Sequence, residues 1–107
     1  VTVLENSNLE ECVLEDSKVE TKTGSGSGGL IAKVTASTVK NNTIKNTLIK
    51  TSGGTTKHGI LAGISDDAST FTDNKVGGTF QGNAITLDLT MIGSGNPTVT
   101  GTSLYTE

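Results

Sequence analysis

The sequence predicts an all-β fold: a short right-handed parallel β-helix (solenoid) of about three coils with a C-terminal capping hairpin. The first observation is composition, because the chain of 107 residues contains 14 Gly and 19 Thr while aromatic residues make up 3%. Thr, Val and Ile favour strands, whereas Gly and Asn favour the tight bends between strands. The second observation is a repeat of about 30 residues, which is typical of arrays whose units cover one another's apolar faces.

The repeat is clearest in two hexapeptides. Residues 29–34 read Gly-Leu-Ile-Ala-Lys-Val and residues 59–64 read Gly-Ile-Leu-Ala-Gly-Ile, an offset of 30 (59 − 29). A second stretch occurs three times, at residues 9–17, 39–47 and 71–79. Apolar residues occupy its first and sixth positions in each copy: Leu9 and Leu14, Val39 and Ile44, Phe71 and Val76. We expect equivalent residues to stack in columns through the coils.

Polar residues follow the same alignment. One predicted column contains Cys12, Asn42 and Asn74, and another contains Ser17, Thr47 and Thr79. The offset rises from 30 (39 − 9) to 32 (71 − 39) between the copies. We place the two extra residues in the loop of residues 66–69, because surface loops tolerate insertions.

The repeat divides a single domain into units of about residues 1–28, 29–58 and 59–90. Residues 84–92 alternate between apolar and polar, residues 93–97 carry turn formers, and residues 98–105 alternate again. Residues 91–107 are therefore either a cap or the start of a further coil. Some closure is expected, because an open end presents unpaired backbone groups.

Other repeat architectures fit less well. Helical repeats need helical spacing of apolar residues and good helix formers, which this Thr- and Gly-rich chain lacks. β-Propeller blades usually carry more aromatic residues and a longer repeat. An antiparallel β-sandwich is the alternative all-β arrangement.

The two hexapeptides resemble the GLUG motif. The resemblance is carried by residues 29–32 (Gly-Leu-Ile-Ala) and 59–63 (Gly-Ile-Leu-Ala-Gly), with Asn42 and Asn74 downstream. Ala32 stands where the motif has Gly, and Ile60 where it has Leu. The motif belongs to repeat regions of large bacterial surface proteins, including adhesins and some cell-wall-attached proteases. The resemblance implies an exported, non-catalytic β-solenoid segment and assigns no ligand-contacting residue.

Charges are unevenly placed along the chain. Residues 1–20 hold six acidic residues and one lysine, whereas residues 21–65 hold six lysines and no acidic residue. With an offset of 30, the glutamates at 10, 15 and 20 are expected to face the lysines at 40, 45 and 50. Such pairs would specify the register of the coils. The absence of arginine and the scarcity of aromatic residues argue against a nucleic-acid partner.

Candidate chemistry is sparse. His58 is predicted to be a solvated turn residue, and Asp66, Asp67 and Asp73 offer either a plain turn or carboxylate ligands for calcium. The loops at residues 24–28, 52–58 and 65–69 are expected to stack along one edge of the coils. Their candidate ligand-facing residues are Ser25, Ser27, Lys57, His58, Asp66 and Asp67.

The sequence predicts a non-catalytic structural or adhesive segment of an exported bacterial cell-surface protein, without cofactor, metal or membrane insertion. The alternatives are a glycan-binding module that uses the stacked loops and, less favoured, a fragment of a polysaccharide-degrading β-helix enzyme. Expected partners are a glycan or host-surface protein, the rest of a longer parent chain, or another copy joined end to end. A single cysteine, Cys12, rules out an internal disulfide and is expected to be a structural free thiol.

Overall fold

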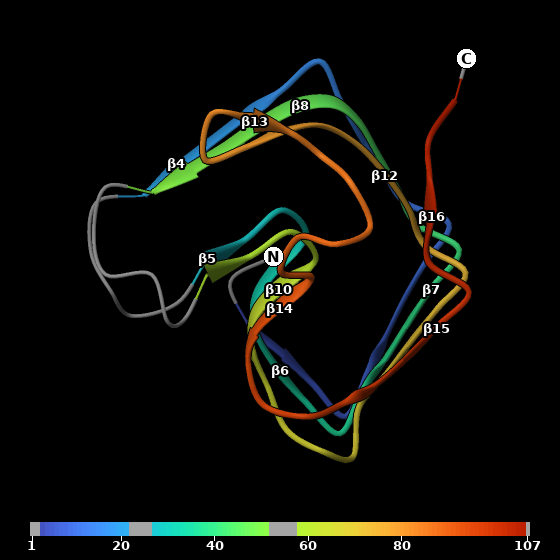
Figure 1. Cartoon of the computed structure of the whole chain (residues 1–107). Helices are drawn as coiled ribbons and strands as arrows, with labels where there is room; N and C mark the ends of the chain where they lie inside the picture. Colours follow the sequence, from blue (N-terminus) through green and yellow to red (C-terminus); the bar gives the residue numbers. More distant parts are fainter. Residues whose placement is uncertain (1–2, 22–26, 52–57, 107) are drawn as a thin grey trace.

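A computed structural model describes residues 3–21, 27–51 and 58–106, in which there are strands and no helix (Figure 1). No helix of the described residues is long and apolar enough to span a bilayer. The strands are β1 (Val3–Glu5), β2 (Asn8–Glu10), β3 (Val13–Glu15), β4 (Lys18–Thr21), β5 (Ser27–Gly28), β6 (Ile31–Thr35), β7 (Thr38–Lys40), β8 (Thr43–Thr51), β9 (His58–Gly59), β10 (Ala62–Ser65), β11 (Thr70–Thr72), β12 (Lys75–Phe80), β13 (Asn83–Ala84), β14 (Ile92–Ser94), β15 (Thr98–Thr100) and β16 (Ser103–Leu104).

The chain adds strands to three mainly parallel sheets in turn and then repeats the same order. We term β1–β4 the first pass, β5–β8 the second, β9–β13 the third and β14–β16 the fourth. The first sheet has the order β1-β6-β10-β14 and the second β2-β7-β11-β15, so each takes one strand from every pass. The third sheet joins β3 and β4 to β8, β8 to β12, and β12 to β16. Strands of successive passes therefore overlie one another in the ring seen in Figure 1.

Two aliphatic columns cross these sheets, as the sequence predicts. Leu9 pairs with Val39, Val39 with Phe71 and Phe71 with Val99. The second column contains Leu14, Ile44, Val76 and Leu104. The two middle members of each column are 0% exposed, whereas Val99 and Leu104 in the fourth pass are 36% and 42% exposed. Burying each middle side chain contributes about 1.5–3 kcal/mol.

The first two passes have a five-residue spacing of corners that the sequence analysis did not predict. Corner residues with left-handed backbone recur every five positions, at 6, 11 and 16 in the first pass and at 36, 41 and 46 in the second. An inward-facing apolar residue lies two positions before each corner, and a small polar residue or cysteine follows it. Asn and Asp tolerate this conformation better than other residues with a side chain, which explains Asn6, Asp16, Asn41 and Asn46.

Polar side chains that follow the corners accept hydrogen bonds from backbone amides of the preceding pass. Ser37 Oγ accepts from the Ser7 amide at 3.1 Å, and Ser69 Oγ accepts from the Ser37 amide at 3.1 Å. Asn42 Oδ1 accepts from the Cys12 amide at 3.0 Å in the same way. Ser37, Ser69 and Asn42 are buried, so these ladders satisfy corner amides that the strand pairing leaves free.

The predicted alignment of the two hexapeptides is wrong by one residue. The structure pairs Gly28, and not Gly29, with Gly59, and it pairs Ile31 with Ala62. A later shift of register between Val76 and Gly78 places Gly78, and not Thr79, opposite Thr47. The offset is 31 (59 − 28) at Gly28 and 32 (70 − 38) at Thr70, so only one of the two extra residues lies between them.

The C-terminal part does not form the predicted capping hairpin. β14, β15 and β16 pair in parallel with β10, β11 and β12, so they are a fourth pass, in agreement with the alternative prediction of a further repeat in residues 91–107. The described hairpin lies earlier, between the antiparallel strands β12 and β13, where Gln81 and Gly82 both have positive φ. The other pairings are parallel, which contradicts an antiparallel sandwich among the described strands.

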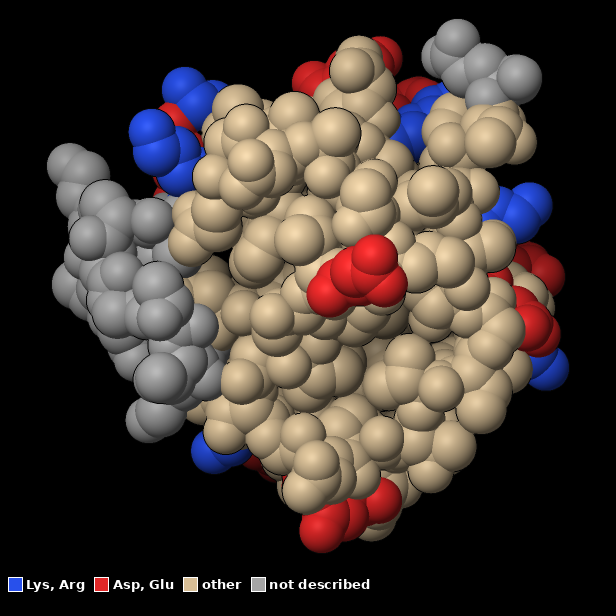
Figure 2. Space-filling model, in the orientation of Figure 1, with Lys and Arg blue, Asp and Glu red and all other residues tan. Residues whose placement is uncertain are grey.

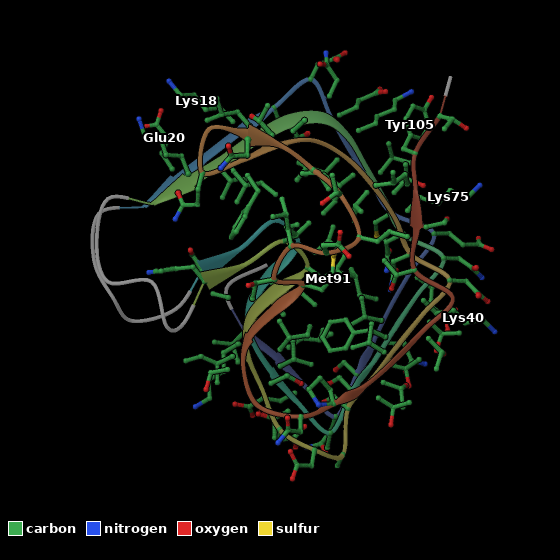
Figure 3. All side chains as sticks on the ribbon, in the orientation of Figure 1. Lys18, Glu20, Lys40, Lys75, Met91 and Tyr105 are labelled. Carbon is green, nitrogen blue, oxygen red and sulfur yellow. The ribbon has the colours of Figure 1, made fainter. Side chains whose placement is uncertain are left out.

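Residues 85–91, expected to be mostly strand, instead cross the inside of the ring without strand pairing (Figure 1). Ile85 is buried, and Leu89 and Met91 pack against the core. Met91 lies near the middle of the ring in Figure 3. The Thr90 and Met91 carbonyls accept hydrogen bonds from Ile60 and Leu61. This segment covers apolar side chains that the third pass would otherwise leave open.

Candidate functional site

The sequence-predicted loop residues Ser27 and His58 form a buried pair. Ser27 Oγ and His58 Nδ1 are 2.7 Å apart, and the two residues are neighbours in β5 and β9. Ser27 is 6% and His58 is 2% exposed, so the expectation of a solvated His58 is wrong. Both side chains are removed from solvent, and each contacts the other across two stacked passes. The pair links two passes and does not present a surface for a ligand.

Asp66 and Asp67 hold the corner between β10 and β11. Asp66 accepts from Ser69 Oγ at 2.6 Å and from the Ala36 amide at 3.0 Å. The Ser69 hydrogen bond, followed by those of backbone amides, lowers the pKa of Asp66 from its ordinary value. Asp67 Oδ1 accepts from the Asn96 amide at 3.2 Å. Both carboxylates therefore bind backbone groups of other passes, the arrangement expected of a structural turn.

The four predicted ligand-facing residues that are described lie in two separate places. Asp66 and Asp67 follow β10, whereas Ser27 and His58 lie in β5 and β9, which belong to a separate sheet. Ser25 and Lys57 lie outside the described residues. Within residues 3–21, 27–51 and 58–106, no group of three or more His, Cys, Asp or Glu side chains could hold a metal ion.

The predicted charge register is correct, but one of the three facing pairs forms an ion pair. Glu10, Glu15 and Glu20 are the strand neighbours of Lys40, Lys45 and Lys50. Lys45 Nζ lies 2.8 Å from Glu15 and 5.3 Å from the Tyr105 ring centroid. Glu15, followed by Tyr105, raises the pKa of Lys45 above its ordinary value. Glu20 instead contacts Lys18 of its own strand at 2.5 Å (Figure 3).

The charged side chains point away from the ring. Lys40 and Lys75, on β7 and β12, project outwards in Figure 3. Figure 2 shows the same arrangement on one face, where charged groups gather mainly towards the periphery around a largely uncharged centre. The buried polar side chains form the hydrogen-bond ladders between passes. The charged side chains at the surface can form ion pairs between passes, as Glu15 and Lys45 do, or contact partners.

The first pass has no described strand on its outer side, and this face is the candidate site. Each of its strands, β1 to β4, pairs on one side with the second pass and has no described strand on the other. Its inward residues are less buried than those of the middle passes: Leu4, Leu9, Leu14 and Val19 are partly exposed. A hollow at this face is lined by Leu9, Cys12, Val13, Leu14, Gly29 and Leu30.

Acidic residues surround this face of the first pass. Glu5, Glu10, Glu15 and Glu20 recur every five residues and are exposed, and the corner residues Glu11 and Asp16 add two further exposed carboxylates. The free thiol of Cys12 is also exposed, because no described pass covers its column from outside. An apolar strip with an acidic margin and strand edges that lack a described partner is suited to pairing with a further strand.

Sequence reasoning missed this site, although a signal for it was present. The spacing of Leu4, Leu9, Leu14 and Val19 marks one inward residue per pentad, and the glutamate after each of the four marks the outer face. This pattern of inward and outward residues identifies residues 3–21 as a complete pass. The structure shows a described neighbour on one side of that pass. No protein-family model, curated protein or solved structure matches the chain.

Proposed function

We propose that each pass is one coil of a right-handed parallel β-helix and that the chain is a non-catalytic structural segment. In this role it holds or spaces other parts of an exported bacterial cell-surface protein, including adhesive ones. The observation that carries the proposal is the vertical register of strands β2, β7, β11 and β15. Parallel neighbours are separated by about 4.8 Å, so every added coil lengthens the stack by a fixed step.

The disposition of polar groups supports a structural role. Ser27, Ser37, Asn42, Ser69 and Asn74 are buried and bind groups of neighbouring passes. Their hydrogen bonds hold backbone to backbone across the stack. Side chains used in this way set the coil register, which is what a rigid spacer requires.

Placement at the bacterial surface rests on the resemblance of residues 29–32 and 59–63 to the GLUG motif. The polar composition agrees with it, because the chain has 19 Thr, 14 Gly and a mean hydropathy of −0.15. A single cysteine leaves folding independent of internal disulfides.

A distance measurement tests the spacer role. The chain is inserted between two fluorescent proteins and compared with a Gly-Ser linker of equal length. The folded stack measures 32 × 31 × 22 Å, whereas a flexible linker of this length has a root-mean-square span of about 55–60 Å. We expect efficient energy transfer with a narrow distance distribution, and a broad distribution like that of the linker contradicts a rigid spacer.

The surface location has its own test. Antibodies against the purified chain should label intact cells of the source organism, whereas labelling that requires lysis contradicts export. Turnover of an acidic polysaccharide by the purified chain would contradict the non-catalytic role.

A further inference from the structure

We propose that the outer face of the sheet β2-β7-β11-β15 binds ice through a regular array of threonine hydroxyls. We term this surface the threonine face, and its threonines are Thr38, Thr70, Thr72, Thr98 and Thr100. The proposal goes beyond the structural role, because a spacer requires no particular side chains on its outer faces. The face runs along the side of the stack (Figure 1), so a pass added before or after the described ones would extend it and not cover it.

Strand pairing brings the threonines into register. Thr70 pairs with Thr98 and Thr72 with Thr100 between β11 and β15, and Thr38 pairs with Thr70 between β7 and β11. The offset from Thr70 to Thr98 is 28 (98 − 70), which departs from the 30-residue repeat, so the repeat alone does not align these residues. One column therefore holds Thr38, Thr70 and Thr98, and the adjacent column holds Thr72 and Thr100.

Alternation along the strands directs these side chains outwards. Phe71, which lies between Thr70 and Thr72, packs in the core and is 0% exposed. Successive side chains of a strand point to opposite faces of the sheet, so Thr70 and Thr72 lie on the outer face. The same alternation places Thr98 and Thr100 on this face, and both are exposed.

The hydroxyls of the threonine face are available to solvent. None of the five has a hydrogen-bond partner among the described residues. Thr47, a buried threonine of β8, contrasts with them, because its hydroxyl donates to the Lys45 carbonyl at 2.9 Å. A threonine hydroxyl without a protein partner keeps both its donor and its acceptor capacity for water.

The array has two regular spacings. Neighbouring strands lie about 4.8 Å apart, and residues two positions apart on one strand are about 6.6–6.8 Å apart. Threonine is β-branched and adopts few side-chain rotamers, so its hydroxyl and methyl groups hold their positions. Rows of oxygen atoms in ice repeat at spacings close to these two. Water molecules bound by the hydroxyls and enclosed by the methyl groups can therefore join the lattice of a growing crystal.

The residue types on this face favour ice over other ligands. Glu10 and Lys40 precede Thr72 and Thr100 in their column, whereas β11 and β15 contain no charged residue. An anionic ligand would require cations along the whole face. A sugar site is usually concave and lined with aromatic side chains, but the aromatic residue of β11, Phe71, is buried beneath the face. A neutral array of hydroxyl and methyl groups matches crystalline water.

Partition into ice tests the proposal. Ice is grown slowly on a cooled probe in a solution of the chain, and protein concentration is then measured in the ice and in the remaining liquid. Ice excludes ordinary solutes as it grows. We therefore expect the chain to be enriched in the ice relative to an inert protein of similar size in the same solution.

Substitutions locate the contact. Thr72→Tyr places a bulky ring within the array and should abolish the enrichment. The matched control is Thr43→Tyr, because Thr43 is also a half-buried strand residue but lies in β8, in another sheet, and this variant should keep the wild-type enrichment. Thr100→Tyr, at an exposed residue of the array, provides a second test if Thr72→Tyr does not fold. Circular dichroism checks the folding of each variant.

Exclusion of the wild-type chain from ice overturns the proposal. Equal enrichment of Thr43→Tyr and Thr100→Tyr also overturns it, because the contact would then lie elsewhere. Saturable binding of a glycan that Thr100→Tyr abolishes, without enrichment of the wild-type chain in ice, would instead assign the face to a glycan.

Discussion

The side chains of Asn42 and Asn74 are joined by a hydrogen bond of 3.1 Å between Nδ2 and Oδ1. Asn74 Oδ1 also accepts from the Asn42 amide at 3.0 Å, and Asn74 Nδ2 donates to the Val39 carbonyl at 3.1 Å. Both asparagines are almost fully buried. Because each uses its amide group on backbone of the preceding pass, the ladder fixes which residues of two passes face each other.

Replacing Asn74 with Ala should therefore be strongly destabilising. The substitution leaves the Asn42 amide and the Val39 carbonyl buried without these partners, and we expect a loss of about 2–4 kcal/mol in the free energy of unfolding. Urea denaturation measures it. Asn83→Ala is the matched control, because Asn83 is exposed and makes one long bond of 3.4 Å. Similar losses for both variants would contradict the ladder.

Depth within one column should determine the cost of truncating an apolar side chain. Phe71 is 0% exposed and Val99, its neighbour in the fourth pass, is 36% exposed. We expect Phe71→Ala to cost about 3–5 kcal/mol and Val99→Ala to cost less than about 1 kcal/mol. Thermal and urea denaturation compare the two. A larger loss at Val99 would show that the fourth pass, not the third, lies in the core.

The left-handed corner at Ala36 offers a stabilising substitution. Ala36 has φ 47°, close to the values of Asn41 and Asn46 at the next two corners, and it is exposed. Asn accepts this conformation more readily than Ala, so Ala36→Asn should raise the free energy of unfolding by about 0.5–1 kcal/mol. Ala84→Asn, at an exposed strand residue without positive φ, should give no gain. Equal effects at both positions would rule out corner strain as the cause.

Asp66 should contribute to the pH dependence of stability. Its pKa is lowered in the folded chain, mainly by the Ser69 hydroxyl, whereas an unfolded aspartate has a pKa of about 3.9. Between the folded and the unfolded pKa, the unfolded state binds more protons than the folded state. The stabilising contribution of Asp66 is therefore present above about pH 4 and is lost as pH falls through the folded pKa. Asp66→Asn should be less stable near neutrality, and it should lose less stability than the wild type as pH falls below about 4. A wild-type slope for Asp66→Asn would contradict this role.

Much of the fold could be predicted from residues that recur with an offset near 30. The columns of Leu9 and Leu14 are in the predicted register. One alignment there places apolar residues opposite apolar residues and glutamates opposite lysines at the same time, so the two signals agree. The alignment of the two hexapeptides was wrong by one residue. Both begin near consecutive small and aliphatic residues, so an alignment shifted by one residue matches similar residue types equally well. The sequence left a cap and a further repeat open for residues 91–107, because alternation is the same in parallel and antiparallel strands.

The candidate site was harder to predict. Burial of His58 depends on Ser27 lying above it in the neighbouring pass, which a local turn pattern does not reveal. Lys18, and not Lys50, contacts Glu20 at 2.5 Å, because two side chains on one face of a strand compete with a cross-strand partner. The uncovered face of the first pass is recognised only when the described partners of each strand are known.

Cross-linking of cysteines introduced at residues 40 and 72 tests the register most directly. Lys40 and Thr72 are strand neighbours at an offset of 32 (72 − 40), and facing residues lie within the Cα separation that a disulfide spans, about 4.4–6.8 Å. In a Cys12→Ser background, Lys40→Cys with Thr72→Cys should oxidise to an intrachain disulfide and keep the native circular dichroism spectrum. Lys40→Cys with Thr70→Cys, the pair that a strict 30-residue repeat would align, should remain reduced. Preferential oxidation of the second pair, or of neither, would contradict the stacked passes.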